Sequence, residues 1–191
     1  RSADKIRSRL GLSEEKLLIG TGADRTTRRK GMDLFYNMLA HEPVPADSAE
    51  VLLFGRTREP SRSDLAYDIT VAGFVDEKTL DNIYSEIDVL VVPSRQEAFG
   101  QTASEALASG TPVVAFDATG PADIITHKTT GYLAQPFDSA DLANGIKWAL
   151  TSADHRSYLS RLTRTAAVER FSMPVIAKQS DRVYDAMISS T

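Results

Sequence analysis

Short runs of apolar residues recur along the chain, and each ends at a glycine, a proline or a polar residue. The runs are nearly continuous rather than alternating, which is typical of strands buried on both faces of a parallel sheet. We therefore predict strands at Leu17–Ile19, Val51–Phe54, Ile69–Phe74, Val89–Val92 and Val113–Phe116.

Helical patterns separate several of these strands. We predict helices at about 31–40, 77–86 and 101–109, the second with Asp76 as N-cap and the third with Gly110 just past its end. Strand and helix alternate, which predicts an α/β fold with a doubly wound, Rossmann-like parallel sheet.

The last third of the chain, after Tyr132-Leu133, is expected to be entirely helical. We predict one helix from Asp138 through Leu150, a second capped by Ser152, and a last one that begins around Ser172 and Pro174. The apolar residues of this last helix share one face and are Ile176, Val183 and Met187.

The composition indicates one folded unit. Of 191 residues, 42% are hydrophobic and 25% are charged, which allows a sizeable core. No repeat or internal linker divides the chain, so residues 1–191 are treated as one domain. A net charge of −4 argues against general nucleic-acid binding, and the absence of cysteine excludes disulfides and cysteine nucleophiles.

Several common motifs of α/β enzymes are missing. Gly20-Thr21-Gly22 follows the first strand, but Arg25 replaces the third glycine of the dinucleotide-binding pattern. The sequence contains no Walker A motif and no Gly-x-Ser-x-Gly motif. The histidines are scattered and no Asp-x-Asp pair occurs, so we predict no metal site.

Two cations follow the first predicted strand. In a doubly wound sheet, ligands bind at the carboxyl ends of the strands. Arg25 and Lys30 lie at such an end, beside the helix N-terminus predicted at 100–102. Cations and a helix dipole at one place suit a diphosphate. The alternative is a solvated basic loop, because charge runs usually face water.

Two carboxylates flank the same helix start. Glu97 lies on the loop after the fourth strand, and Glu105 lies eight residues later, inside the helix. Ala106-Leu107-Ala108 follows Glu105, so the helix is expected to be largely buried and its glutamate to have a partner, for which a ribose diol is suitable. The alternative is that both glutamates are surface residues.

These residues belong to a set of motifs that covers nearly the whole chain, of which the central one is the most specific. The motifs are Arg25…Lys30-Gly31, Gly73-Phe74-Val75, Asp88 with Val89–Ser94, Glu97–Gly100, Glu105–Val114, Gly120-Pro121 through Thr130–Leu133, and Arg170–Ser172. With them the chain resembles the C-terminal domain of GT-B glycosyltransferases, in particular the retaining enzymes of family 4.

The resemblance implies a domain that binds a nucleotide-activated sugar. Arg25 and Lys30 would hold the diphosphate, Glu105 would bond to the ribose hydroxyls, and Glu97 would contact the donor sugar. Backbone contacts would come from Phe99, Gly100, Gln101 and Thr102 toward sugar and phosphate, and from Val75 toward the base.

The chemistry implied by this resemblance needs no metal and no cofactor. Cations and helix N–H groups stabilise the charge that develops on the leaving nucleoside diphosphate, UDP or GDP. The leaving phosphate itself helps to deprotonate the acceptor. One departure from the family pattern is the arginine-rich loop, in which Arg28 or Arg29 could take the role given to Arg25.

The resemblance also implies a missing partner. GT-B enzymes bind their acceptor, such as a growing glycan or a lipid-linked sugar, through an N-terminal domain that this chain does not contain. Residues Lys5–Leu12 resemble the segment that precedes the C-terminal domain. We therefore expect a donor-binding fragment with little or no turnover of its own. The full enzyme is expected to be cytoplasmic, with possible peripheral attachment to the inner face of the membrane.

Two other interpretations stay open at this stage. The domain could have kept the fold and lost catalysis, because a fold does not guarantee a function. It could also belong to a sugar-nucleotide epimerase of GT-B shape, which would release product without an acceptor.

Overall fold

A computed structural model describes residues 6–24, 28–56, 64–118 and 120–189. In these ranges a six-stranded parallel sheet has the strand order β3-β2-β1-β4-β5-β6. The strands are β1 (Leu17–Asp24), β2 (Ala49–Arg56), β3 (Asp68–Gly73), β4 (Val89–Val92), β5 (Val113–Phe116) and β6 (Gly131–Ala134). The fold is the Rossmann-like parallel sheet predicted from the sequence.

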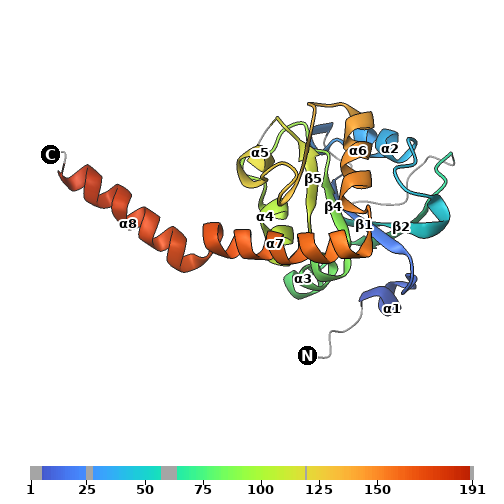
Figure 1. The fold of residues 1–191 in the computed structure, drawn as a ribbon, viewed down its shortest axis with the longest axis horizontal. Coiled ribbons are helices and arrows are strands. Elements are labelled where there is room, and N and C mark those ends of the chain that lie inside the picture. Colours follow the sequence, from blue (N-terminus) through green and yellow to red (C-terminus); the bar gives the residue numbers. More distant parts are fainter. Residues whose placement is uncertain (1–5, 25–27, 57–63, 119, 190–191) are drawn as a thin grey trace.

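Helices cover both faces of the sheet (Figure 1). They are α1 (Ile6–Leu10), α2 (Met32–Leu39), α3 (Glu77–Glu86), α4 (Gln101–Ala108), α5 (Gly120–Ile124), α6 (Ser139–Ala149), α7 (Ala153–Phe171) and α8 (Met173–Ser189), with short 3-10 turns at Arg28–Lys30 and Ala46–Ser48.

The core has two parts, one on each side of the sheet. On one side, α2 and α6 pack on side chains such as Val51 and Val91. On the other side, α1, α3, α4 and α5 pack on Leu52, Leu90 and Ala115. The central strands β4 and β5 are buried along their whole length, which explains their continuous apolar sequences.

The strand order reverses between β1 and β4. The loops that follow these two strands contact each other at this point of the sheet. The Arg95 N–H donates to the Arg29 carbonyl at 2.8 Å. Gly31 has a φ of 65°, and a Cβ built on it would lie 1.9 Å from the Pro93 carbonyl oxygen. Only glycine therefore lets the two loops approach this closely. A crevice at such a reversal is where doubly wound sheets bind ligands.

Most predicted elements form, and the differences have physical causes. β4, β5 and α3 have the predicted bounds, and Asp76 caps α3 by accepting from the Thr79 N–H. β1 extends beyond its predicted end at Ile19 through Gly20-Thr21-Gly22 to Asp24, because it pairs with β2 along eight residues. The sixth strand, β6, was not among the predicted strands and pairs with β5, and beyond it the elements are the helices α6, α7 and α8, as predicted.

Helix α7 crosses the molecule beside α4 and ties down the ends of two other helices. Arg164 Nη1 donates to the carbonyl of Ala108, the last residue of α4, at 2.7 Å. Arg170 donates to the carbonyls of Asp123 and Ile124 at the end of α5, at 2.8 and 2.9 Å. These bonds satisfy carbonyls that a helix end leaves without partners.

Helix α8 extends away from the sheet and its helices (Figure 1). The three residues predicted to share one face, Ile176, Val183 and Met187, are 40%, 59% and 65% exposed. The helix forms as predicted, but its apolar face stays in contact with solvent.

Candidate functional site

The loops after β1 and β4 bring Lys30 and Glu97 into contact. Lys30 Nζ lies 2.7 Å from Glu97 Oε2, and the two side chains are 21% and 18% exposed. Ser94 Oγ donates to the same oxygen at 3.3 Å. Arg29 Nη1 is 3.7 Å from Glu97 Oε1 and donates to the Gln96 carbonyl at 3.0 Å. Glu97 is therefore surrounded by cations and a hydroxyl, and its nearest cation, Lys30, lies 67 positions earlier in the sequence.

The other arginines of this loop are arranged differently. Arg25 lies outside the described residues, so the structure does not place it. Arg28 is exposed, and its carbonyl accepts from Arg95 Nη1 at 3.2 Å. Arg95 also forms two 2.6 Å hydrogen bonds with the Asp33 carboxylate, whose pKa this pairing lowers. Arg95 thus fixes the cationic loop against α2.

Helix α4 begins at the carboxyl edge of the sheet, as predicted. Gly100 takes a left-handed conformation (φ 87°) at the N-cap and offers no side-chain cap. A Cβ there would lie 3.2 Å from Pro121 and Ile124 atoms of α5. The N–H groups of Gln101 and Thr102 occupy the first turn, where the helix has no carbonyl to accept from them. This helix start can therefore face an anion.

A cavity of about 310 Å³ lies beside this helix start. Four of the predicted site residues line it: Lys30, Gln101, Thr102 and Glu105. The remaining lining residues are Gly22, Phe54, Gly55, Leu80 and Tyr84. The lining therefore combines a cation and a helix N-terminus with a carboxylate and apolar side chains.

Glu105 is held on both carboxylate oxygens. Tyr84 Oη donates to Oε2 at 3.0 Å, and Gln101 Nε2 donates to Oε1 at 2.9 Å. Tyr84 is 1% exposed, and burial raises the pKa of its hydroxyl, as does the neighbouring Glu105 carboxylate. The Tyr84 hydroxyl therefore stays protonated and serves as the donor.

The described lining residues of this cavity do not include four of the predicted ones, namely Glu97, Phe99, Gly100 and Val75. Glu97 reaches it through its contact with Lys30. Phe99 is 58% exposed on the loop before α4, and its backbone lies against Gly120. Val75 follows β3 and packs, partly buried, on the core beside α3.

Tyr84 was missed by sequence reasoning. Its signal was a tyrosine that shares one face of a predicted helix with Leu80 and Ile87, since a buried tyrosine hydroxyl usually has a hydrogen-bond partner. That partner, Glu105, becomes apparent only when α3 and α4 are placed side by side.

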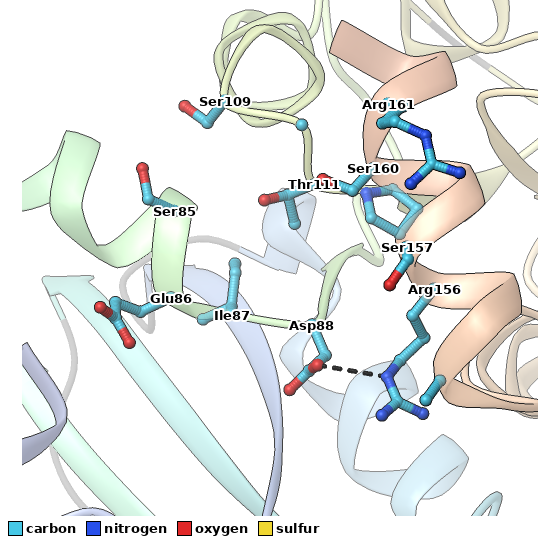
Figure 2. Close-up of a pocket in the computed structure, with 13 residues that line it drawn as sticks. Ser85, Glu86, Ile87, Asp88, Ser109, Thr111, Arg156, Ser157, Ser160 and Arg161 are labelled. Atoms are coloured by element: carbon cyan, nitrogen blue, oxygen red, sulfur yellow. Dashed lines mark ion pairs between the residues drawn. The ribbon is translucent and has the colours of Figure 1, made fainter. Parts of the chain in front are cut away.

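A larger cavity, of about 550 Å³, lies at the opposite edge of the sheet (Figure 2). Asp88, which immediately precedes β4, and Thr111, two residues before β5, line it together with arginines of α7. Arg156 Nε lies 3.5 Å from Asp88 Oδ1, and Arg7 pairs with the same carboxylate. These charges connect helices to the amino ends of the strands, away from the crevice where such sheets bind ligands.

Among the described residues, no three His, Cys, Asp or Glu side chains gather closely enough to hold a metal ion. In the same part of the chain, no helix combines the length and apolar character that crossing a bilayer needs.

Comparison with known proteins identifies the family. The model of the family described as "Glycosyl transferases group 1" matches residues 2–166. The chain belongs to this family. The resemblance noted in the sequence is thereby confirmed.

Individual relatives agree with this assignment. A glycosyltransferase of Methanocaldococcus jannaschii is 30% identical over 90% of this chain and 45% of its own length. Mannosylfructose-phosphate synthase of Agrobacterium fabrum is 32% identical over 91% of this chain and 41% of its own length. The chain thus spans less than half the length of these curated relatives.

Solved structures share the fold. Sucrose-phosphate synthase from Thermosynechococcus elongatus superposes with a TM-score of 0.78 and 30% identity, over 97% of this chain and 49% of that one. Anabaena HepE, solved in complex with UDP-glucose, has a TM-score of 0.79 at 23% identity, over 96% of this chain and 52% of its own. The sheet and its helices match GT-B glycosyltransferase structures.

Proposed function

We propose that this chain is the donor-binding domain of a retaining, metal-independent glycosyltransferase that uses a UDP- or GDP-sugar. The observation that carries the proposal is one cavity at the strand-order reversal, lined by Lys30, the start of α4 and Glu105. Membership of the group 1 glycosyl transferases supports a nucleotide-sugar donor as its ligand.

In this proposal each predicted residue keeps its role. Lys30 holds the diphosphate, together with Arg25 or with Arg29, which already lies beside Glu97. The N–H groups of Gln101 and Thr102 face phosphate oxygens. Glu105 accepts hydrogen bonds from the ribose hydroxyls.

The remaining contacts involve the two ends of the donor. Glu97 contacts hydroxyls of the sugar once the diphosphate has replaced Glu97 as the ion-pair partner of Lys30. The backbone at Phe99 and Gly100 lies against the sugar, and the backbone at Val75 meets the base. The family pattern supports these roles, and Glu97 in addition lies 2.7 Å from Lys30, which lines the cavity.

The chemistry requires charge stabilisation on the leaving group. When the bond between the anomeric carbon and the donor phosphate breaks, negative charge develops on the diphosphate. A fixed cation and helix N–H groups stabilise that charge without reorganising, and one such donor typically contributes about 3–4 kcal/mol. Lys30 and α4 offer this stabilisation without a metal ion or a cofactor.

The activity of the whole protein requires more than this domain. The relatives are about twice as long as the chain, which supports an acceptor-binding N-terminal domain in the full enzyme. We propose a glycan or lipid-linked acceptor, a cytoplasmic location with peripheral membrane attachment, and little or no turnover by these 191 residues alone.

A binding screen tests the proposal. The chain is titrated calorimetrically with UDP, GDP, ADP and their sugars, with and without magnesium. A ligand at about 100 times its dissociation constant stabilises the fold by about 2.7 kcal/mol, which a thermal shift detects. We expect magnesium-independent binding of one diphosphate, lost in Lys30→Ala and in Glu105→Ala. A folded wild-type chain that binds none of these ligands would refute the proposal.

A further inference from the structure

Tyr84 occupies an unusual position for a core residue. Its ring is buried between α3 and the sheet, and it packs edge-on against Phe54 with ring centroids 5.9 Å apart. Phenylalanine would fill this space equally well. The hydroxyl therefore calls for a separate explanation, because a buried polar group costs free energy unless it is paired.

The hydroxyl points to the cavity's single carboxylate. Glu105 is the only acidic residue among the described residues that line the 310 Å³ cavity. Its Oε2 accepts from Tyr84 at 3.0 Å, and its Oε1 accepts from Gln101 at 2.9 Å. A carboxylate has about four lone-pair sites, so each oxygen can accept one further hydrogen bond.

The two donors differ in how firmly they hold Glu105. Gln101 is exposed and lies one turn earlier on the same helix, so its amide can move with solvent. Tyr84 belongs to a different helix and is 1% exposed, and its backbone carbonyl also accepts from the Thr111 hydroxyl. Tyr84 is therefore the donor that holds the Glu105 carboxylate in a fixed position.

We propose that Tyr84 is a positioning residue for ribose recognition. Its hydroxyl holds the Glu105 carboxylate so that one free site on each oxygen faces two vicinal hydroxyls. This inference rests on the proposed function, and it assigns to the Tyr84–Glu105 pair the preference for a ribonucleotide over its deoxy analogues.

The test compares two ligands in two tyrosine variants. UDP or GDP, whichever the wild type binds, is titrated beside its 2′,3′-dideoxy analogue. Tyr84→Phe keeps the ring and removes only the hydroxyl. The matched control is Tyr67→Phe, because Tyr67 is also buried but lies in the other core cluster and donates to the backbone carbonyl of Val44. Thermal unfolding of each variant confirms that it is folded.

The expected result is a loss of selectivity. Tyr84→Phe should weaken ribonucleotide binding about 10-fold or more, as expected when one hydrogen bond to a charged group is lost, and leave dideoxy binding within about 2-fold. Tyr67→Phe should change the affinity for neither ligand.

Two contrary outcomes have different meanings. If folded Tyr84→Phe keeps the wild-type ratio of the two affinities, the positioning role is wrong while the proposed function stands. If the wild type binds neither nucleotide, the proposed function fails and this inference fails with it.

Discussion

Substituting Glu97 by glutamine should make the chain bind a bare nucleoside diphosphate more tightly. Lys30 is paired with Glu97 at 2.7 Å. A diphosphate that binds Lys30 must break this ion pair, and it is then repelled by the nearby negative charge of Glu97. Glutamine has the same shape but no charge, so it removes both costs.

The size of the effect follows from the burial of the pair. Exposed ion pairs couple by about 0.2–1 kcal/mol. Close charge pairs in desolvated interfaces reach about 1.5 kcal/mol or more. The Lys30 and Glu97 side chains are 21% and 18% exposed, which places them near the boundary between these classes. We therefore expect about 1.4 kcal/mol, which is a tenfold lower dissociation constant.

The assay is calorimetric titration of the wild type, Glu97→Gln and Asp117→Asn with UDP or GDP. Asp117 is an exposed carboxylate just after β5, so Asp117→Asn changes the net charge equally at the same sheet edge. We expect a gain in Glu97→Gln alone, and a smaller gain for the intact sugar nucleotide because a contact to the sugar is weakened. Unchanged or weaker diphosphate binding by folded Glu97→Gln would show that the pair does not oppose the ligand.

Two further predictions concern stability. Gly31→Ala should lower the free energy of unfolding by about 3 kcal/mol or more in urea titrations, because its Cβ would meet the Pro93 carbonyl at 1.9 Å. Gly11→Ala, equally left-handed but in open space, should cost only about 1–2 kcal/mol, and equal losses would contradict the clash. Arg95 lowers the pKa of Asp33, so this pair stabilises the fold above the ordinary carboxyl pKa and ceases to do so as the pH falls through the folded value. Melting temperatures of wild type and Asp33→Asn should therefore differ at about pH 7 and converge below about pH 4.

The strands and helices could be predicted where the local pattern and the tertiary environment agree. The buried β4 and β5 are continuous apolar runs, and α3 carries its own capping aspartate. The local sequence pattern was insufficient where pairing between strands determines the backbone conformation. Gly20-Thr21-Gly22 has the composition of a turn, yet it lies within β1 because β2 offers hydrogen bonds along the whole strand.

The candidate site was predictable in its members and less so in its contacts. Lys30, Gln101, Thr102 and Glu105 were chosen from motifs, and they line one cavity. The contact between Lys30 and Glu97 joins residues 67 positions apart, and that between Tyr84 and Glu105 joins two different helices. Neither sequence spacing nor periodicity specifies such distances.

The arginines of α7 have a consequence for defining the smallest useful version of this domain. The family model ends at residue 166, within α7 and before Arg170. A chain cut there would keep Arg164 at the end of α4 but lose the two hydrogen bonds from Arg170 to the end of α5. Since α5 packs against Gly100, where α4 begins, the lost anchor lies one helix away from the cavity. Truncation designs should therefore retain the chain through Phe171, whatever is done with α8.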